Sequence, residues 1–232
     1  MSATQEEDEM NDHLTIVTGH YGSGKTEFAV NLAFRLSREG NAVTLADLDI
    51  VNPYFCSRER KQELTQQGIR VIVSKGADSD LPAINPEVYA LFEPGVCGII
   101  DAGGDAVGAQ TLGRFSQKIK CVPYELLCVV NFNRPDTNTP QKAEAYLRQI
   151  EYSARLSVTG LVNNTHLDHE TTTQDILRGA ELSEELSTLS GVPVIYHAFE
   201  ERFSGRLNLP QEQQFPMQLY MRKPWEFEST VI

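Results

Sequence analysis

The chain contains, near its start, the stretch Gly19-His20-Tyr21-Gly22-Ser23-Gly24-Lys25-Thr26. This stretch fits the phosphate-binding pattern G-x-x-x-x-G-K-[ST] at every fixed position. The apolar, β-branched run Leu14–Thr18 precedes it, and apolar residues recur at steps of three and four behind it, as in an amphipathic helix. The pattern therefore predicts a buried strand, a phosphate-binding loop and a helix, in that order.

The residue types of the loop explain how it would hold a phosphate. Gly19, Gly22 and Gly24 have no Cβ, so the backbone can turn successive N–H groups inward around an anion at the start of a helix. We expect Lys25 to reach the β- and γ-phosphates, and the hydroxyl of Thr26 to be an oxygen ligand of Mg²⁺. The whole loop is accordingly predicted to contact the nucleotide.

Length and composition indicate a globular protein. Of the 232 residues, 41% are hydrophobic and 22% are charged, which suffices for one α/β domain with a full core. No apolar stretch approaches the roughly 18 residues of a membrane-spanning helix, so no integral membrane segment is expected. We expect residues 13–232 to form a single nucleotide-binding domain in the cytoplasm.

The chain is strongly acidic. The net charge is −12 at pH 7, and residues 1–12 hold five acids and no base. This composition is the opposite of that of a secretory signal or transit peptide, and we expect residues 1–12 to be a disordered tail. An acidic chain disfavours nonspecific contact with nucleic acid, and no nucleic-acid partner is expected.

Carboxylates close two of the strand-like runs. The run 42–46 leads into Asp47-Leu48-Asp49, and the run 96–100 leads into Asp101. In an open α/β sheet, ligands bind at the carboxyl ends of the strands, so these acids should lie on the same edge as the phosphate loop. A hydrophobic strand ending in aspartate is typical of a Walker B element, whose carboxylate holds a Mg²⁺-bound water. Residues 106–120 would then form a switch that responds to the γ-phosphate.

Amide side chains follow the next two strand-like runs. The run 124–130 is followed by Asn131-Phe132-Asn133, and the run 157–162 by Asn163-Asn164. An amide offers both a donor and an acceptor, which suits the edge of an adenine. Asn133 and Asn164 are therefore predicted to lie in the nucleotide site. The guanine-reading pattern Asn-Lys-x-Asp occurs nowhere in the chain, which favours ATP over GTP.

Histidines and cysteines form weaker patterns. His166 and His169 are three residues apart, a spacing compatible with a metal site, although two solvated histidines are the simpler interpretation. No C-x-x-C pair is present, and the cysteines are expected to be reduced and buried. The cysteines are Cys56, Cys97, Cys121 and Cys128.

The order of the elements predicts the fold class. Strand-like runs alternate mostly with helical ones, and the motifs fall at the carboxyl ends of the strands. The predicted strands are 14–18, 42–46, 69–73, 96–101, 124–130, 157–162 and 192–196. We therefore expect a three-layer, doubly wound α/β fold with a mostly parallel sheet of about seven strands.

These motifs resemble those of the MinD, ParA and nitrogenase iron protein group of P-loop ATPases. The likeness covers roughly residues 13–200 and lies in the loop 19–26, in Asp47-Leu48-Asp49 and in Asp101-Ala102-Gly103-Gly104. The loop together with Asp49-Ile50-Val51-Asn52-Pro53-Tyr54-Phe55 is closer still to short stand-alone proteins of the cobyrinic acid synthase/MinD nucleotide-binding type.

The resemblance implies a role for each matching residue. It implies that Lys25 and Thr26 bind phosphate and Mg²⁺, and that Asp47 supports the metal. Asp49 would orient the attacking water, and Asp101 would act on the metal without binding it directly. Asn164 would contact the adenine. ATP and Mg²⁺ are therefore the expected cofactors, and Lys25 and Asp49 the expected catalytic residues.

One position departs from the MinD pattern. MinD-like loops carry a second lysine that reaches the partner's nucleotide across a dimer, but here His20 stands at that position and Tyr21 replaces a glycine. Dethiobiotin synthetase resembles this chain in fold, also lacks that lysine, and uses ATP to activate a carboxyl group. The segment Asp47-Leu48-Asp49 is nearer to the MinD type.

Three functions stay open on these grounds. The first is an ATP-hydrolysing conformational switch, expected to be a homodimer with a protein partner. The second is an ATP-dependent ligase or small-molecule kinase, with a small-molecule substrate. The third is a nucleotide sensor or metal-delivery scaffold that uses the histidines and cysteines.

Overall fold

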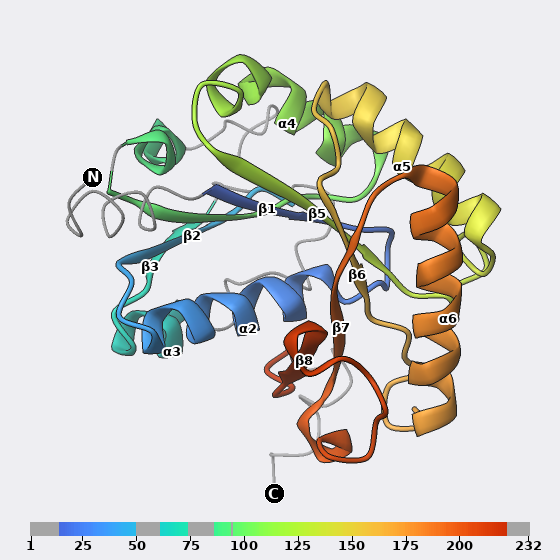
Figure 1. Ribbon diagram of the computed structural model, residues 1–232. Helices are drawn as coiled ribbons and strands as arrows, with labels where there is room; N and C mark the ends of the chain where they lie inside the picture. Colours follow the sequence, from blue (N-terminus) through green and yellow to red (C-terminus); the bar gives the residue numbers. More distant parts are fainter. Residues whose placement is uncertain (1–13, 50–60, 74–85, 94, 222–232) are drawn as a thin grey trace, which may run out of the picture.

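The structure is a computed structural model that describes residues 14–49, 61–73, 86–93 and 95–221, apart from the side chains of 106 and 107. The expected acidic tail, the stretch 50–55 and Cys56 lie outside these residues. The described strands form an eight-stranded sheet in the order β3-β2-β4-β1-β5-β6-β7-β8 (Figure 1). Every neighbouring pair is parallel. The strands are β1 (Leu14–Thr18), β2 (Val43–Asp47), β3 (Arg70–Val73), β4 (Cys97–Asp101), β5 (Tyr124–Val130), β6 (Gly160–Asn163), β7 (Val194–Glu200) and β8 (Gln214–Met217).

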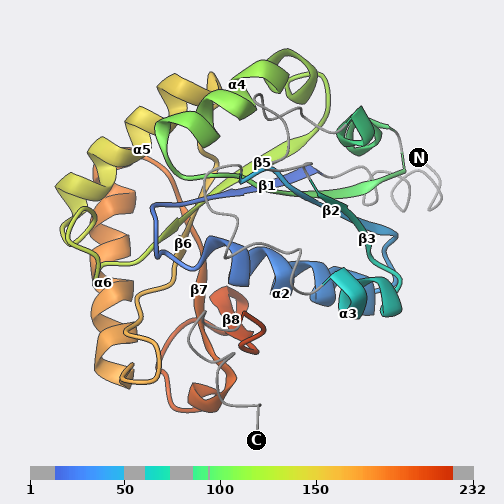
Figure 2. The same ribbon diagram turned by 180° about the vertical axis from the view of Figure 1, so that it is seen from behind.

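Helices cover both faces of the sheet, so the predicted three-layer, doubly wound α/β class is confirmed. Helices α4, α5 and α6 pack on one face, and α2 and α3 on the other (Figure 2). The α-helices are α2 (Lys25–Arg38), α3 (Lys61–Gln66), α4 (Ala106–Ile119), α5 (Pro140–Ala154) and α6 (Thr173–Ser190). Short 3₁₀ turns are η2 (Pro86–Phe92), η3 (Glu201–Phe203) and η4 (Gln211–Gln213). Over the described residues, every helix is too short or too polar to cross a membrane.

The eighth strand is a difference from the sequence-based prediction. Strand β8 contains Pro216, and a proline argues against a strand because it cannot donate a ladder hydrogen bond. Here the proline is tolerated because, among the described strands, β8 is the edge of the sheet and pairs only with β7. Phe215 and Met217 are buried, and the ring of Phe215 lies 4.7 Å from that of Phe28 in α2. The strand therefore extends the layer that supports α2.

Local capping explains where two of the helices begin. The side chain of Thr172 accepts a hydrogen bond from the backbone of Asp175, and the Asp175 carboxylate accepts one from Thr172, which forms a capping box at the start of α6. The side chain of Asp105 accepts a hydrogen bond of 2.7 Å from the Gly108 N–H at the start of α4. The segment 106–120, predicted to be a switch, is therefore mostly helix, and its first turn is fixed by Asp105.

The cysteine prediction was partly wrong. Cys97 and Cys128 are buried in strands, as expected, but Cys121 is exposed. Cys121 follows the end of α4 in the turn that leads to β5, and its thiol donates to the Gln117 carbonyl at 3.1 Å. An exposed turn, rather than a core strand, sets the environment of this thiol.

A buried histidine in β7 predicts a loss of stability in acid. His197 is 2% exposed, and burial lowers its pKa below the ordinary value of 6.5, although a hydrogen bond with Gln213 acts in the other direction. Because the unfolded chain takes up this proton first, the free energy of unfolding should fall as the pH drops below about 6.5.

The variant His197→Gln isolates this contribution. It should remove part of the acid dependence, because its side chain has no titratable group. Urea unfolding of both proteins between pH 5 and pH 8 measures the difference. Identical pH slopes for the two proteins would show that His197 does not titrate with unfolding.

Candidate functional site

The loop predicted to bind phosphate joins β1 to α2. Gly22 and Gly24 have φ values of 75° and 82°, in the left-handed region that favours glycine. The loop is closed by a hydrogen bond of 2.9 Å from the Ser23 N–H to the His20 carbonyl, and Phe28 N donates to the Gly24 carbonyl at 2.9 Å. The strand, loop and helix therefore have the predicted order and the tight backbone that the glycines allow.

Side chains from the segments that follow β5 and β6 bind the carbonyl groups of the loop. The Gly22 carbonyl accepts from Asn131 Nδ2 at 3.2 Å and from Arg134 Nε at 3.0 Å, and the Ser23 carbonyl accepts from Asn164 Nδ2 at 2.7 Å. The C=O and N–H of one trans peptide point in opposite directions. Because the Ser23 carbonyl points toward Asn164, the N–H of Gly24 in the same peptide points away from Asn164.

The loop's lysine and threonine contact carboxylates from two strands. Lys25 Nζ lies 2.7 Å from Asp49 Oδ2, and Thr26 Oγ1 donates to Asp101 Oδ2 at 2.7 Å. Asp49 N donates to Asp47 Oδ1 at 3.1 Å. All these side chains are buried. The sheet order explains the cluster, because β1 lies beside β4 and β4 beside β2, and their carboxyl ends meet at one edge.

The described residues of this cluster are mostly acidic. Among them three aspartates face one lysine, and burial raises the pKa of Asp101 to about 7, against the attraction of Lys25. Burial also acts to lower the pKa of Lys25, but Asp101, Asp49 and Asp47 raise it above its ordinary value. Among the described residues, the cluster therefore holds more buried carboxylates than cations.

Two observations test whether Mg²⁺ fits these residues. Asp101 Oδ1 is buried and accepts no hydrogen bond from the described residues. Within the described ranges, no group of three or more His, Cys, Asp or Glu side chains could hold a metal by itself. Mg²⁺ beside a nucleotide needs only one or two protein oxygens, because phosphates and waters supply the others. The hydroxyl of Thr26 and the carboxylate of Asp101 therefore fit a nucleotide-bound Mg²⁺.

A cavity of about 590 Å³ opens on one side of the loop. Its walls combine loop atoms with apolar side chains from β7, η3 and β8, and its size is typical of a small-molecule site. It is lined by Tyr21, Gly22, Gly24, Lys25, Thr26, Glu27, Arg134, Asn164, Thr165, His166, Asp168, Thr171, Ile176, Ala198, Phe199, Glu200, Phe203, Met217, Leu219 and Met221. The apolar wall suits the base and sugar of a nucleotide whose phosphates lie in the loop.

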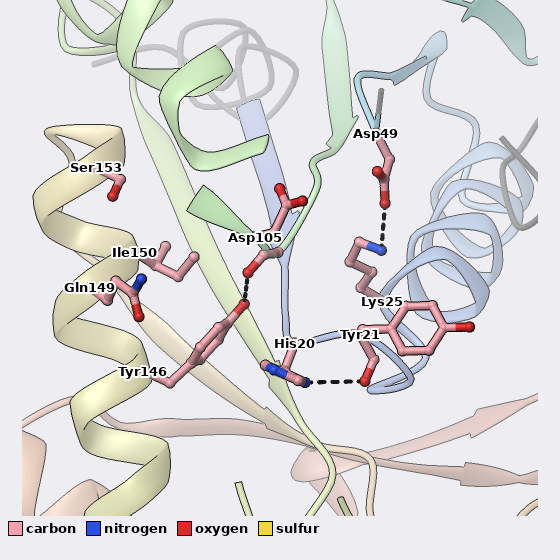
Figure 3. A pocket seen from close by; sticks show the side chains of 10 residues that line it. His20, Tyr21, Lys25, Asp49, Asp105, Tyr146, Gln149, Ile150 and Ser153 are labelled. Carbon is pink, nitrogen blue, oxygen red and sulfur yellow. Dashed lines mark hydrogen bonds and ion pairs between the residues drawn. The ribbon is translucent and has the colours of Figure 1, made fainter. Parts of the chain in front are cut away.

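A second cavity, of about 350 Å³, opens on the other side of Lys25 against helix α5 (Figure 3). The hydroxyl of Tyr146 in α5 donates a hydrogen bond of 2.5 Å to the Gly104 carbonyl. The ring of Tyr146 lies edge-on to the ring of His20, with the two ring centroids 5.3 Å apart. The cavity is lined by His20, Tyr21, Lys25, Asp49, Gly104, Asp105, Tyr146, Gln149, Ile150 and Ser153. Lys25 and Asp49 thus border a space large enough for more than a water molecule.

Most of the residues predicted for the nucleotide site lie together in the structure, but one does not. The loop, Asp47, Asp49, Asp101 and Asn164 come together at one edge of the sheet. Asn133 does not join them, because its amide oxygen accepts a hydrogen bond from Arg178 of α6 and it lines neither cavity.

Sequence reasoning missed three residues that contact the loop or its neighbours. Arg134 and Asn131 bind the Gly22 carbonyl, and both follow β5, where the sequence pattern predicts a role for amides at strand ends but none for an arginine. Tyr146 lies within an amphipathic helix, where nothing in the sequence distinguishes it from a packing residue. Of the two histidines, His166 lines the larger cavity, whereas His169 is exposed beside Asp168.

Comparison with known proteins identifies the family. Residues 14–176, more than half of the chain, match the CobQ/CobB/MinD/ParA nucleotide binding domain. No match was found among curated proteins.

Similar solved structures agree on the fold. FtsY from Mycoplasma mycoides has a TM-score of 0.52 at 16% identity, over 79% of this chain and 58% of that chain. The signal recognition particle 54 kDa protein from Aeropyrum pernix K1, in complex with GDP, has a TM-score of 0.53 at 20% identity, over 79% and 40%. The cell division protein FtsY from Thermotoga maritima has a TM-score of 0.51 at 22% identity, over 79% and 60%.

The two kinds of comparison carry different weight. The chain spans between 40% and 60% of the length of these structural neighbours, and at such identities the likeness concerns the fold alone. The family match, in contrast, covers the loop, both aspartate-bearing strands and Asn164, and it confirms the resemblance drawn from these motifs. The chain belongs to the family of the CobQ/CobB/MinD/ParA nucleotide binding domain.

Proposed function

We propose that this protein is a Mg²⁺-dependent ATP-binding switch that hydrolyses ATP. The observation that carries the proposal is the ion pair of 2.7 Å between Lys25 of the loop and Asp49 beyond β2. A γ-phosphate in the loop competes with Asp49 for Lys25. When Lys25 turns to the phosphate, Asp49 is released from Lys25, so the arrangement can couple nucleotide binding to the position of Asp49.

The same exchange supplies the hydrolytic chemistry. Lys25 and the inward N–H groups of the loop stabilise the negative charge that develops on the transferred phosphoryl group. Asp49, released from Lys25, accepts a hydrogen bond from the attacking water and orients it in line with the leaving group. The peptide of Gly104, held between the loop and Tyr146, lines the same cavity as Lys25 and Asp49.

Thr26 and Asp101 are the residues proposed to hold Mg²⁺. The Thr26 hydroxyl would hold the ion, and Asp101 would support it through Oδ1, which has no hydrogen-bond partner among the described residues. Asp47, which accepts from the Asp49 N–H, supports this arrangement. Bound with the nucleotide, Mg²⁺ would neutralise charge on the β- and γ-phosphates.

The base is proposed to be adenine. Asn164 lines the larger cavity and uses its NH₂ group to hold the Ser23 carbonyl, which leaves its amide oxygen to accept from an exocyclic amine. No Asn-Lys-x-Asp pattern is present to read a guanine. Asn133, which is bonded to Arg178, has a supporting rather than a base-reading position.

Calorimetry with ATP and GTP tests the proposal. With Mg²⁺ present we expect saturable binding of ATP, with GTP weaker by about tenfold, a difference of about 1.4 kcal/mol. Chelation of Mg²⁺ with EDTA should weaken the binding of ATP. Equal or tighter binding of GTP would overturn the assignment of the base, and the absence of any heat with either nucleotide would overturn the function.

A homodimer is part of this proposal, with His20 at the position where related loops carry a lysine. Size-exclusion chromatography with ADP and with a nonhydrolysable ATP analogue should then give different elution volumes. Identical volumes would argue for a protein that binds ATP without changing its assembly.

The cavity beside α5 favours a second candidate function, an ATP-dependent ligase or small-molecule kinase. This cavity reaches Lys25 and Asp49, where the γ-phosphate would lie, and its roughly 350 Å³ could hold a small acceptor. A switch should hydrolyse ATP slowly without any addition. A ligase or kinase should release ADP only when a suitable acid or alcohol is supplied, so a screen of a metabolite pool for ADP release separates the two.

A further inference from the structure

One arginine outside the phosphate-binding pattern lies against the loop. Arg134 sits in a turn that follows β5, where its N–H donates to the Asn131 carbonyl at 3.1 Å and its own carbonyl accepts from the Thr137 N–H at 3.1 Å. The Thr137 hydroxyl also donates to the Asn131 carbonyl, at 2.7 Å. The backbone N–H and the backbone carbonyl of Arg134 are therefore both hydrogen-bonded within the turn, which fixes the position of its Cα.

The side chain of Arg134 is fitted to the loop. Its Nε donates to the Gly22 carbonyl at 3.0 Å. A Cβ on Gly22 would come within 2.7 Å of Nε and 2.8 Å of Cζ, so the guanidinium group occupies space that any other residue would fill. The phosphate-binding pattern leaves position 22 open to any residue. The glycine there is instead required by its positive φ and by the approach of Arg134.

The rest of the guanidinium group is uncommitted. Among the residues that the structure describes, Arg134 has no carboxylate partner, and its terminal nitrogens make no hydrogen bond. These nitrogens carry several N–H donors in a rigid plane. Within the described part of the chain, Arg134 is thus a cation without a counter-ion, bonded to the loop through Nε and able to bind a ligand through its terminal nitrogens.

The place of this cation suggests its ligand. Arg134 lines the larger cavity together with Gly24, Lys25 and Thr26. Of the described residues around the two cavities, Lys25 and Arg134 are the only lysine and arginine. A polyphosphate carries several negative charges, and Lys25 is already shared with buried aspartates. A second cation beside the loop would therefore add substantially to phosphate binding.

We propose that Arg134 is a phosphate-binding residue, which fastens the loop through Nε and contacts the phosphate chain of the nucleotide through its terminal nitrogens. The proposal rests on the nucleotide site proposed above and adds to it a residue that the motif does not contain. Because the guanidinium plane is already oriented by Gly22, little conformational freedom is lost when the nucleotide binds.

The test compares three substitutions at one position by calorimetry with Mg²⁺ and AMP, ADP or ATP. Arg134→Ala removes both the loop contact and the charge. Arg134→Gln keeps an N–H donor for the Gly22 carbonyl but no charge, and Arg134→Lys keeps the charge. Arg148→Ala is the matched control, because Arg148 is an exposed arginine of α5 that pairs with Glu144 and Glu151.

We expect Arg134→Ala and Arg134→Gln to bind ADP and ATP about tenfold more weakly than the wild type, with a smaller effect on AMP. Arg134→Lys should recover part of the affinity, and Arg148→Ala should bind as the wild type does. The affinity of the wild type should also fall more steeply with salt than that of Arg134→Gln.

Other outcomes overturn the inference in distinguishable ways. Recovery with Arg134→Gln but not with Arg134→Lys would make Arg134 a support for the loop without a phosphate contact. An equal loss for AMP, ADP and ATP would assign Arg134 to the nucleoside. Wild-type affinity in Arg134→Ala would overturn the inference alone, whereas a wild-type protein that binds no nucleotide would overturn the proposed function with it.

Discussion

Gly104→Ala is expected to destabilise the fold by about 3 kcal/mol and to abolish nucleotide binding. A Cβ at this position would lie 1.8 Å from the Gly19 carbonyl oxygen and 2.7 Å from the Tyr146 hydroxyl. Neither the Gly19 carbonyl nor the Tyr146 hydroxyl can move without disturbing other contacts. The carbonyl belongs to the first residue of the phosphate loop, and the Tyr146 hydroxyl is bonded to the Gly104 carbonyl at 2.5 Å. Any relief of the clash therefore displaces the loop or the start of α4.

Urea unfolding and calorimetry with ATP measure the two effects of Gly104→Ala. Gly98→Ala is a matched control on the same strand-to-loop segment. There a Cβ would approach the ends of two side chains, Leu14 Cδ1 at 3.0 Å and Leu91 Cδ2 at 3.2 Å, rather than the backbone of the phosphate loop. We expect this control to cost less stability than Gly104→Ala and to bind ATP normally. Equal behaviour of the two variants would contradict the close contact between Gly104 and the loop.

The parts of the site that are contiguous in sequence could be predicted from the sequence. The run Leu14–Thr18 forms β1 with the predicted bounds, because the loop behind it and its β-branched residues leave no other interpretation. Asp47 and Asp101 are the last residues of β2 and β4. The general rule that parallel strands end at one edge then placed them beside the loop.

The same rule could not distinguish Asn133 from Asn164. Both amides follow a strand, but the side chain of Asn164 reaches the Ser23 carbonyl, whereas that of Asn133 is bonded to Arg178 of α6. Which amide faces the cavity depends on how α6 packs, and a strand-end pattern contains no information on that.

Residues that act across long sequence separations were not predictable for the same reason. The bond between Arg134 and Gly22 spans 112 positions, and that between Tyr146 and Gly104 spans 42. From the sequence alone, a tyrosine inside an amphipathic helix is expected to pack in the core, and an arginine in a turn is expected to be solvated. Only the meeting of β5, α5 and the loop gives these side chains a role at the site.

The other large effect is expected from Lys25→Ala. Loss of the lysine should slow ATP hydrolysis by about 10²–10³-fold, the range seen when one charge-stabilising donor is removed. It should also lower the free energy of unfolding by about 3–5 kcal/mol, because it removes a cation that pairs at close range with a buried carboxylate. Lys25 is 8% exposed and Asp49 is 2% exposed, so water does not replace the missing partner.

The double variant Lys25→Ala/Asp49→Asn separates the two roles of Lys25. Removing the Asp49 charge should restore much of the lost stability, since no uncompensated charge is then left at that position, but hydrolysis should stay as slow as in Lys25→Ala. Urea unfolding measures the stability and phosphate release measures the hydrolysis. The control is Lys61→Ala, at an exposed lysine of α3.

Strictly additive stability effects would show that the two side chains are not coupled. Hydrolysis at the wild-type rate in Lys25→Ala would mean that the γ-phosphate is stabilised elsewhere, and the competition between phosphate and Asp49 for one lysine could then not drive the switch.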